Sequence, residues 1–485
     1  MARERYNRRV KDDEFTQRVR RHSPSSLLPL IAAAGARYPR PADWWASPYR
    51  IVTPWALAEI ARVALLYGNE HRSVATEHDL IECLAAYASM DDPELGQSDQ
   101  PEALANFFLR IAGQQLTYQQ DVHNELARTV ALYAMTESSR TTKVITPGWD
   151  VDLLGCSLRE FTAAGLLLNV GAMQNEGRFD VGWLAQPQFA PIVAEVPAST
   201  LEGAIRGQFL TDPADFAIRQ QQLTGTVTGQ GRRFSYNPLV ARPLIGGLAH
   251  TELIPVPYLA IRHASPLGIY YEGLARWGKG FADDTGYLYE SYVGRLLRLL
   301  PGGEVHAAIT FDRDNKESVD WIVVFNGCVV LVEVKSVRPT EPVRLGTSSA
   351  VAEMQRMLSK GLDQLARTAS LIRERHASFT EIPDDRPILG VLATLEPFHV
   401  VNAPWYTQWL PYPGIPYSIC GAFELDHLAE VTDEDPGELL LRGMTDPQRI
   451  GYSLKSMFEG HRLERHQVLS AAWETLPWKE AASDA

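Results

Sequence analysis

Three charged residues interrupt an otherwise apolar stretch of the chain, SVDWIVVFNGCVVLVEVKSV: Asp320, Glu333 and Lys335. Asn326-Gly327 separates two β-branched runs in this stretch, which is the typical signal for a hairpin with a two-residue type I′ turn. Counted outward from that turn, Asp320 lies directly opposite Glu333, with twelve residues between them. Opposed carboxylates repel each other across a strand pair, so this pair needs a cation, and a divalent metal is the natural candidate.

Lys335 should lie on the same face of the hairpin as Glu333, because side chains alternate between faces along a strand and the two residues are two positions apart. Both strands are apolar on both faces, which predicts a sheet covered by helices on each side. Unpaired charges inside such an element would be costly. Asp, Glu and Lys are therefore expected to work together at one end of the sheet, rather than to be solvated surface charges.

A further acid precedes the hairpin in the segment GYLYESYVGRLLRLL, residues 286–300. Its helical periodicity places Tyr289, Val293 and Leu296 on one apolar stripe, and Glu290 lies on that stripe. An acid is out of place there unless it is paired. A metal shared with the two hairpin carboxylates would satisfy it.

A helix with an acid, a strand with Asp and a following strand with Glu-x-Lys resemble the PD-(D/E)xK pattern of the restriction-endonuclease-like nucleases. Here the pattern consists of Glu290, Asp320 and Glu333-Val334-Lys335, and the resemblance covers about residues 280 to 400. Val319 stands where the pattern has Pro, a position that does not touch the chemistry. The resemblance also suggests that Gln364 is the helical Gln that often follows the core in this superfamily.

The resemblance implies a metal-dependent hydrolase of phosphodiester bonds. Its Mg²⁺ or Mn²⁺ would be held by oxygen ligands from Asp320, Glu333, the Val334 carbonyl and Glu290, because hard cations prefer oxygen. The metal would lower the pKa of a bound water and neutralise charge at phosphorus. Lys335 would orient or deprotonate that water and stabilise the transition state, and the products would carry a 5′-phosphate and a 3′-hydroxyl.

The elements that must position these residues predict an α+β multidomain chain. Residues 1–22 form a basic arm that we expect to be solvated, residues 23–279 an α-rich region, and residues 280–485 an α/β nuclease domain with a central mixed β-sheet flanked by helices. Helix starts are predicted at Thr76, after Ser157 and at Asp212-Pro213. Further strands are expected at residues 387–395 and 417–423, and a closing helix near residues 446–473.

Composition limits the class of protein. The chain has 485 residues and a net charge of −13, which argues against coating nucleic acid or membrane through bulk charge. Residues 335–375 nevertheless hold eight basic and four acidic residues, so a phosphate backbone could be held locally. Four dispersed cysteines form no disulfide or zinc framework, and neither a transmembrane segment nor a signal peptide is recognisable. We therefore expect a cytoplasmic protein without membrane contact.

The leading functional expectation is a Mg²⁺-dependent endonuclease acting on DNA. Joined to an unfamiliar helical region, such a domain looks like a bacterial defence or restriction effector, and the helical region would sense a signal, bind a protein partner or hold substrate. Two alternatives stay open: a module that binds nucleic acid without cutting it, and a scaffold whose N-terminal helices engage a partner. RNA as the substrate and assembly into a homo-oligomer also stay open.

Overall fold

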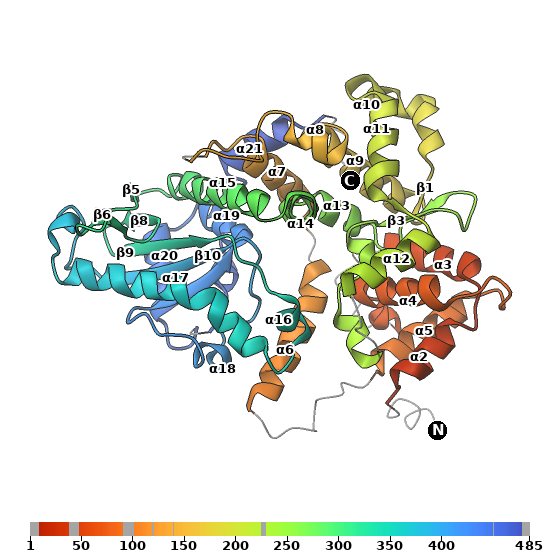
Figure 1. Cartoon of the computed structure of the whole chain (residues 1–485), viewed down its shortest axis with the longest axis horizontal. Helices are drawn as coiled ribbons and strands as arrows, with labels where there is room; N and C mark the ends of the chain where they lie inside the picture. Colours follow the sequence, from red (N-terminus) through yellow and green to blue (C-terminus); the bar gives the residue numbers. More distant parts are fainter. Residues whose placement is uncertain are drawn as a thin grey trace.

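The computed structural model describes residues 9–37, 48–90, 101–118, 121–138, 140–224, 229–449 and 451–477. The chain combines many helices with a five-stranded mixed sheet, which agrees with the α+β expectation (Figure 1). Part of the predicted basic arm, including Arg3, Arg5 and Arg8, lies outside the described residues. The rest is not a solvated arm, because residues 12–19 form a helix that buries Phe15 and Val19.

Most of the chain before residue 279 is helical, as predicted. Its helices are α2 (Asp12–Val19), α3 (Pro24–Ala36), α4 (Pro54–Tyr67), α5 (Glu77–Ala88), α6 (Pro101–Gln115), α7 (Val122–Tyr133), α8 (Trp149–Leu154), α9 (Leu158–Gln174), α10 (Ala190–Glu195), α11 (Ala198–Ala204), α12 (Pro213–Thr224), α13 (Tyr258–Ala264) and α14 (Pro266–Trp277). The three predicted helix starts are confirmed, and Thr76 and Ser157 each form a capping box at theirs.

A small second sheet lies within this helical region. It is built from four two-residue strands, in the order β1-β4-β3-β2: β1 (Arg178–Phe179), β2 (Leu210–Thr211), β3 (Leu244–Ile245) and β4 (Glu252–Leu253). The Pro-rich segment around residues 237–257 supplies β3 and β4 before α13 begins.

The main sheet has the order β11-β10-β9-β8-β5. Its strands are β5 (Glu304–Ala307), β8 (Trp321–Val324), β9 (Val329–Lys335), β10 (Ile388–Thr394) and β11 (Tyr417–Gly421), and a separate pair joins β6 (Thr310–Phe311) to β7 (Lys316–Glu317). Strands β9, β10 and β11 are parallel, whereas β5, β8 and β9 are antiparallel. The predicted mixed sheet and its last two strands are therefore confirmed.

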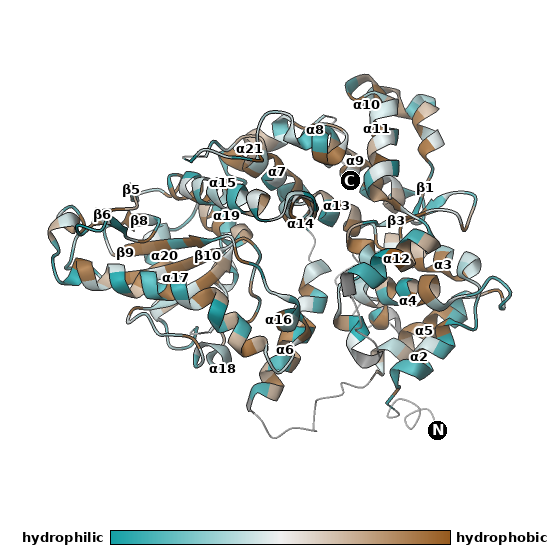
Figure 2. Cartoon of the chain, in the orientation of Figure 1, coloured by the Kyte–Doolittle hydropathy of each residue, from teal (hydrophilic) through white to brown (hydrophobic). Residues whose placement is uncertain are grey.

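Helices cover both faces of this sheet (Figure 1). Helix α15 (Lys279–Leu297) lies on one face, and α17 (Ala350–Arg373) lies on the other, with α16 (Glu341–Leu345) leading into it. Val330 and Val332 of β9 belong to the hydrophobic core on the α15 side, whereas Leu331 belongs to the core on the α17 side. Figure 2 shows β9 and β10 as hydrophobic strands, which explains why their sequences lack the alternation of a half-exposed strand.

The hairpin register predicted from the sequence is confirmed, but the turn type is wrong. Trp321 pairs with Val332 and Val324 with Val329 across a two-residue loop. Neither central residue of that loop, Asn326 or Gly327, has the positive φ that a type I′ turn requires. Contacts from outside the hairpin explain the difference, since Arg386 donates to the Phe325 carbonyl and Gly437 packs against the Phe325 ring.

The long closing helix predicted near residues 446–473 is also wrong. The structure has α18 (Pro404–Thr407), α19 (Ala422–Glu430), α20 (Pro436–Thr445) and then a short α21 (Gln467–Glu474). Pro447 lies two residues after the end of α20, and Gly451 and Gly460 have φ values of +96° and +87°. Proline lacks the N–H that helix propagation needs, and these glycine conformations are not helical, so the apolar periodicity of this segment could not form one helix.

One hydrophobic core extends on both sides of residue 280. It includes residues from Val10 through Leu476, and α7 packs against both α15 and α21. A buried ion pair reinforces that contact, because Arg128 of α7 donates to Asp426 of α19, which also accepts a hydrogen bond from Tyr292 of α15. The helical region and the main sheet are thus joined by shared packing.

Candidate active site

The candidate site lies where β9 ends, on the face of the sheet covered by α17. Glu333 and Lys335 both point to that face, as their two-residue spacing predicted. Helix α17 comes close to the strand at Gly361, where an added Cβ would lie 2.6 Å from Leu392 and 3.6 Å from Cγ of Glu333. The close approach leaves Glu333 with no solvent exposure.

Asp320 lies one residue before β8 and reaches across to β9. Its Oδ2 accepts a hydrogen bond of 2.7 Å from the Val334 backbone N–H. Burial raises the pKa of Asp320, and this hydrogen bond opposes the rise. The carboxylate thereby takes the place of a backbone partner at the end of the strand ladder.

The Val334 carbonyl is directed to the same side of the strand as its N–H, toward Asp320, because both groups of a residue in an antiparallel ladder face the same neighbouring strand. The N–H of Val319, which would otherwise bond this carbonyl, donates instead to Thr368 Oγ1 on α17 at 3.1 Å. A backbone oxygen is therefore directed toward the predicted carboxylates, as the ligand set inferred from the resemblance requires.

Lys335 joins the strand to the helix above it. Its Nζ donates to Glu333 Oε1 and to Gln364 Oε1 of α17, the latter at 2.9 Å. Gln364 thus contacts Lys335, although only the resemblance to the nuclease family suggested a role for Gln364. One ammonium group is held between an acid from the strand and an amide from the helix.

Glu333 carries the most unusual electrostatics of the group. Its Oε2 is buried and has no hydrogen-bond partner among the described residues. Burial raises the pKa of Glu333 to about 7, repulsion from Asp320 adds to the rise, and Lys335 opposes it. Buried polar atoms in folded proteins almost always have a partner, so this oxygen indicates a ligand or a strained functional group.

Glu290 is placed differently from the prediction. Its side chain is half-buried and forms an ion pair with Arg140, whose Nη2 lies 3.5 Å from it, which the sequence did not predict. Burial and then repulsion from Asp320 raise its pKa, whereas Arg140 opposes the rise. Within the described ranges, however, no group of three or more His, Cys, Asp or Glu side chains is arranged to hold a metal ion.

The smaller donor set does fit a hard divalent cation. Asp320, Glu333 and the Val334 carbonyl offer only oxygen atoms, and the unpartnered Glu333 Oε2 is the atom that a cation would satisfy. Such a cation would also relieve the repulsion between the two carboxylates. Glu290 would contribute only after leaving Arg140, or through a water molecule.

Arg140 is a residue that sequence reasoning missed. It lies in the helical region, about 150 positions before the acid it pairs with, and it stacks over Tyr287 of α15 at 5.1 Å. No spacing pattern links residues so far apart, and only the packing of the helical region against α15 brings them together. Trp321 likewise anchors α15, because its Nε1 donates to the Glu290 carbonyl at 3.1 Å.

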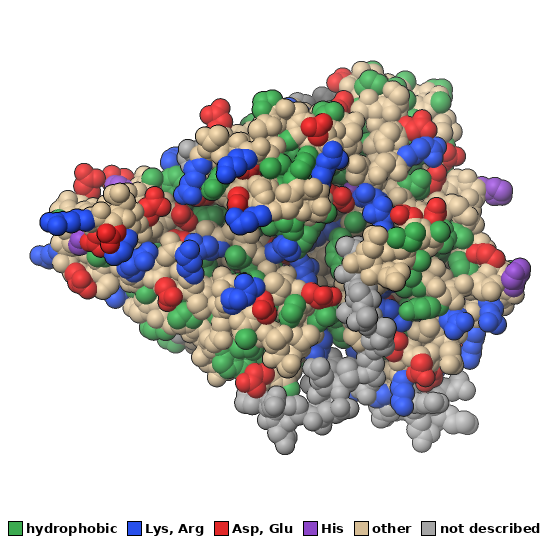
Figure 3. Space-filling view, viewed as in Figure 1, with side chains coloured by type: hydrophobic (Ala, Val, Ile, Leu, Met, Phe, Trp, Pro, Cys, Tyr) green, Lys and Arg blue, Asp and Glu red, His purple; other side chains and the backbone are tan. Residues whose placement is uncertain are grey.

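The basic segment 335–375 is only partly a surface patch. Lys335 and Arg344 are bound to buried acids, and Arg356 and Arg375 form exposed ion pairs with Glu353 and Asp384. Figure 3 shows Lys and Arg side chains interspersed with acids over the α15 and α17 side of the molecule. The remaining exposed cations of α17 that could meet a phosphate backbone are Lys360, Arg367 and Arg373.

No described helix is both long and apolar enough to cross a membrane. Comparison of the chain with protein-family models, curated proteins and solved structures found no match.

Proposed function

We propose that the chain is a metal-dependent nuclease that hydrolyses phosphodiester bonds of DNA, with a restriction-endonuclease-like domain built on the main sheet. The observation that carries this proposal is the buried Glu333, which has an unpartnered oxygen and lies between Asp320 and the Lys335–Gln364 pair. A purely structural ion pair between Glu333 and Lys335 would not require a second, half-buried carboxylate, Asp320, beside it. Burying these charged groups costs stability, and such groups with shifted pKa values are concentrated at functional sites, which supports a catalytic role.

The arrangement of elements supports the fold part of the proposal. A mixed sheet lies between α15, which carries Glu290, and α17, which carries Gln364. The strand with Asp320 at its start precedes the strand with Glu333 and Lys335, in the order that the PD-(D/E)xK pattern has. The support therefore comes from the order of the elements and of the residues that they carry.

The residues divide the chemistry between them. Bound Mg²⁺ or Mn²⁺ would supply a positive charge at phosphorus and lower the pKa of the attacking water. Asp320, Glu333 and the Val334 carbonyl would hold the ion. Lys335 would orient the attacking water and donate to the phosphate oxygen as negative charge builds. Gln364 would hold the Lys335 ammonium in place through the hydrogen bond that it already accepts.

Cleavage of supercoiled plasmid, single-stranded DNA and single-stranded RNA with Mg²⁺ or Mn²⁺ tests the proposal. We expect metal-dependent cutting of DNA that falls at least a hundredfold in Lys335→Ala, since general acid–base groups contribute about 10²–10⁴ in rate, and also in Glu333→Gln, which removes a proposed metal ligand. Matched controls are Lys316→Ala and Glu304→Gln, which alter exposed residues of β7 and β5 and should leave the rate unchanged.

Two outcomes would contradict the proposal. Cutting that survives both site substitutions would place the activity elsewhere or in a contaminant. Metal-independent binding of DNA without any cutting would favour the module that grips nucleic acid without hydrolysing it. Preferential cutting of RNA would keep the site and correct the substrate.

A further inference from the structure

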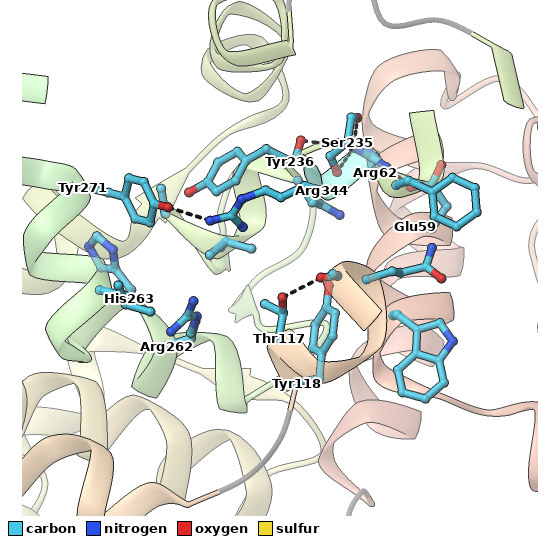
Figure 4. A pocket seen from close by; sticks show the side chains of 18 of the residues that line it. Glu59, Arg62, Thr117, Tyr118, Ser235, Tyr236, Arg262, His263, Tyr271 and Arg344 are labelled. Atoms are coloured by element: carbon cyan, nitrogen blue, oxygen red, sulfur yellow. Dashed lines mark hydrogen bonds and ion pairs between the residues drawn. The ribbon is translucent and has the colours of Figure 1, made fainter. Parts of the chain in front are cut away.

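A polar cavity lies among the helices and loops of the helical region and α16, and no carboxylate of β8 or β9 lines it. The cavity is open to solvent, and its volume with the open mouth included is about 840 Å³. Five segments far apart in the sequence line it: α4, the end of α6 with residues 116–118, residues 233–241, the α13–α14 pair, and α16. Figure 4 shows Arg344 and Tyr236 facing Arg262, Thr117 and Tyr118 across the cavity.

Two of the cavity's guanidinium groups share a single carboxylate. Nη2 of Arg344 lies 2.6 Å and 2.7 Å from the two carboxylate oxygens of Glu396, whereas Nη2 of Arg262 lies 3.6 Å from the same group. Burial opposes ionisation of Glu396, but Arg344 and Arg262 lower its pKa, so it stays charged. The three side chains together carry a net charge of about +1, and among the described residues the ion-pair partner of Arg262 is Glu396, at 3.6 Å.

The acids in the cavity wall are already neutralised. Glu59 accepts hydrogen bonds from Arg62 and from Arg232, and Arg232 also binds Asp12. Glu272 accepts from Arg242 at 3.2 Å. Because each of these carboxylates has its own cation, the excess positive charge of the Arg262–Arg344 group is not cancelled by them. An anion entering the cavity would therefore meet net attraction.

Aromatic rings form much of the remaining wall: Trp55, Tyr118, Phe234, Tyr236 and Tyr271. The Tyr271 hydroxyl is bound to Glu396 and Arg344, at 2.8 Å and 2.6 Å, whereas Tyr236 presents its ring to the cavity. Gln114, Ser235 and Asn237 add amide and hydroxyl groups between the rings. Such a wall offers flat apolar surfaces beside hydrogen-bonding edges, which suits a heteroaromatic ring.

We propose that this cavity binds a nucleotide, with its phosphate on Arg262 and Arg344 and its base against the aromatic wall that includes Tyr236. Guanidinium groups match phosphate oxygens in geometry and are the usual donors for them. A simple inorganic anion would leave the aromatic wall unused, and an uncharged ring would leave Arg262 incompletely paired. The proposal does not depend on the nuclease site, because the two sites share no side chain.

Isothermal titration calorimetry of the full chain with ADP, GDP, CDP and UDP in EDTA measures the dissociation constants and tests the proposal without a cleavage assay. We expect at least one of the four to bind in the micromolar range. Adenosine-type nucleosides and pyrophosphate, which each carry half of the proposed ligand, should bind at least tenfold more weakly. EDTA removes divalent metal, so that binding at the nuclease carboxylates cannot contribute.

Two variants locate the binding. Arg262→Gln should lower the affinity for the nucleotide about ten- to hundredfold, the loss expected for hydrogen bonds to a charged group. Tyr236→Leu should lower it about tenfold, because the base loses its stacking partner. Arg206→Gln, an exposed arginine of the helical region, is the matched control and should bind as the wild type does. Unchanged melting temperatures confirm that the variants fold. The proposal is overturned if none of the four nucleotides binds below 1 mM, on the order of the weakest specific affinities, or if Arg262→Gln binds unchanged.

Discussion

Replacing Glu333 with Gln should stabilise the metal-free protein at alkaline pH, although it removes a proposed metal ligand. Burial raises the pKa of Glu333 from its ordinary 4.5 to about 7 in the folded chain. The folded protein therefore keeps the proton on Glu333 in a pH range where the unfolded chain has lost it. The free energy of unfolding is unaffected by this group below about pH 4.5, falls between pH 4.5 and 7, and stays reduced above pH 7.

The size of the effect follows from the same two pKa values. One pKa unit of difference corresponds to about 1.4 kcal/mol, so a rise from 4.5 to about 7 costs the wild type at most about 3.5 kcal/mol at pH 8. Gln resembles the protonated acid in size and hydrogen bonding, and its amide oxygen can accept from Lys335. We therefore expect Glu333→Gln to be about 1–3 kcal/mol more stable than the wild type at pH 8, and to differ by less than about 1 kcal/mol at pH 5.

Urea unfolding at pH 5 and pH 8 in EDTA measures this difference, and Glu304→Gln, on the exposed edge strand β5, is the control that should change little. Adding Mg²⁺ or Mn²⁺ at pH 8 should then stabilise the wild type but not Glu333→Gln, because a ligand that binds the folded state raises its stability. A loss of stability in Glu333→Gln at pH 8 would refute the reasoning. Glu333 would then be a structural partner of Lys335.

Three further predictions test the surroundings of the site. Gln364→Ala should slow DNA cleavage about ten- to hundredfold, because the Gln364 side chain positions the Lys335 ammonium group. The same change should alter the free energy of unfolding in urea by less than about 1 kcal/mol, since it removes one hydrogen bond. Gly361→Ala places a Cβ 2.6 Å from Leu392 and should cost about 1–3 kcal/mol of stability and lower the cleavage rate, since α17 must move away from Glu333. Burial opposes ionisation of Asp426, but Arg128 lowers its pKa to about 2, so the free energy of unfolding should fall as the pH drops from about 4 toward 2. Asp426→Ala should lose about 3–5 kcal/mol of unfolding free energy in urea at pH 7, because it leaves Arg128 buried without its partner. The control Glu202→Ala, at an exposed ion pair, should lose about 0–1 kcal/mol.

The parts of the site that local sequence could predict are those set by strand alternation and by the hairpin register. Pairing outward from residues 326 and 327 placed Asp320 near the Glu333 strand, and the two-residue spacing placed Lys335 beside Glu333. The apolar character of both strand faces correctly predicted helices on each side. These rules are local, since each depends on residues within about fifteen positions of one another.

The parts that local sequence could not predict depend on long-range packing. Glu290 was expected to share a metal because it interrupts an apolar stripe, but Arg140 from the helical region gives it a partner. The turn at Asn326 was expected to be type I′, but Arg386 holds the carbonyl before it. In both cases a side chain more than fifty positions away overrides a sound local preference. The nucleotide cavity was invisible to sequence analysis for the same reason, because five separate segments line it.

The candidate active site and the cavity are linked through the ends of β9 and β10. The backbone of Lys335 accepts a hydrogen bond of 3.1 Å from Leu395, which directly follows β10, and the next residue, Glu396, holds Arg344 of α16. Arg344 also donates to the carbonyl of Pro339 at 3.1 Å, so it fixes the segment that leaves β9. Contacts to Arg344 and Glu396 therefore bear on the path of the chain just after Lys335. The position of the Lys335 ammonium depends on Gln364 on one side and on this strand end on the other.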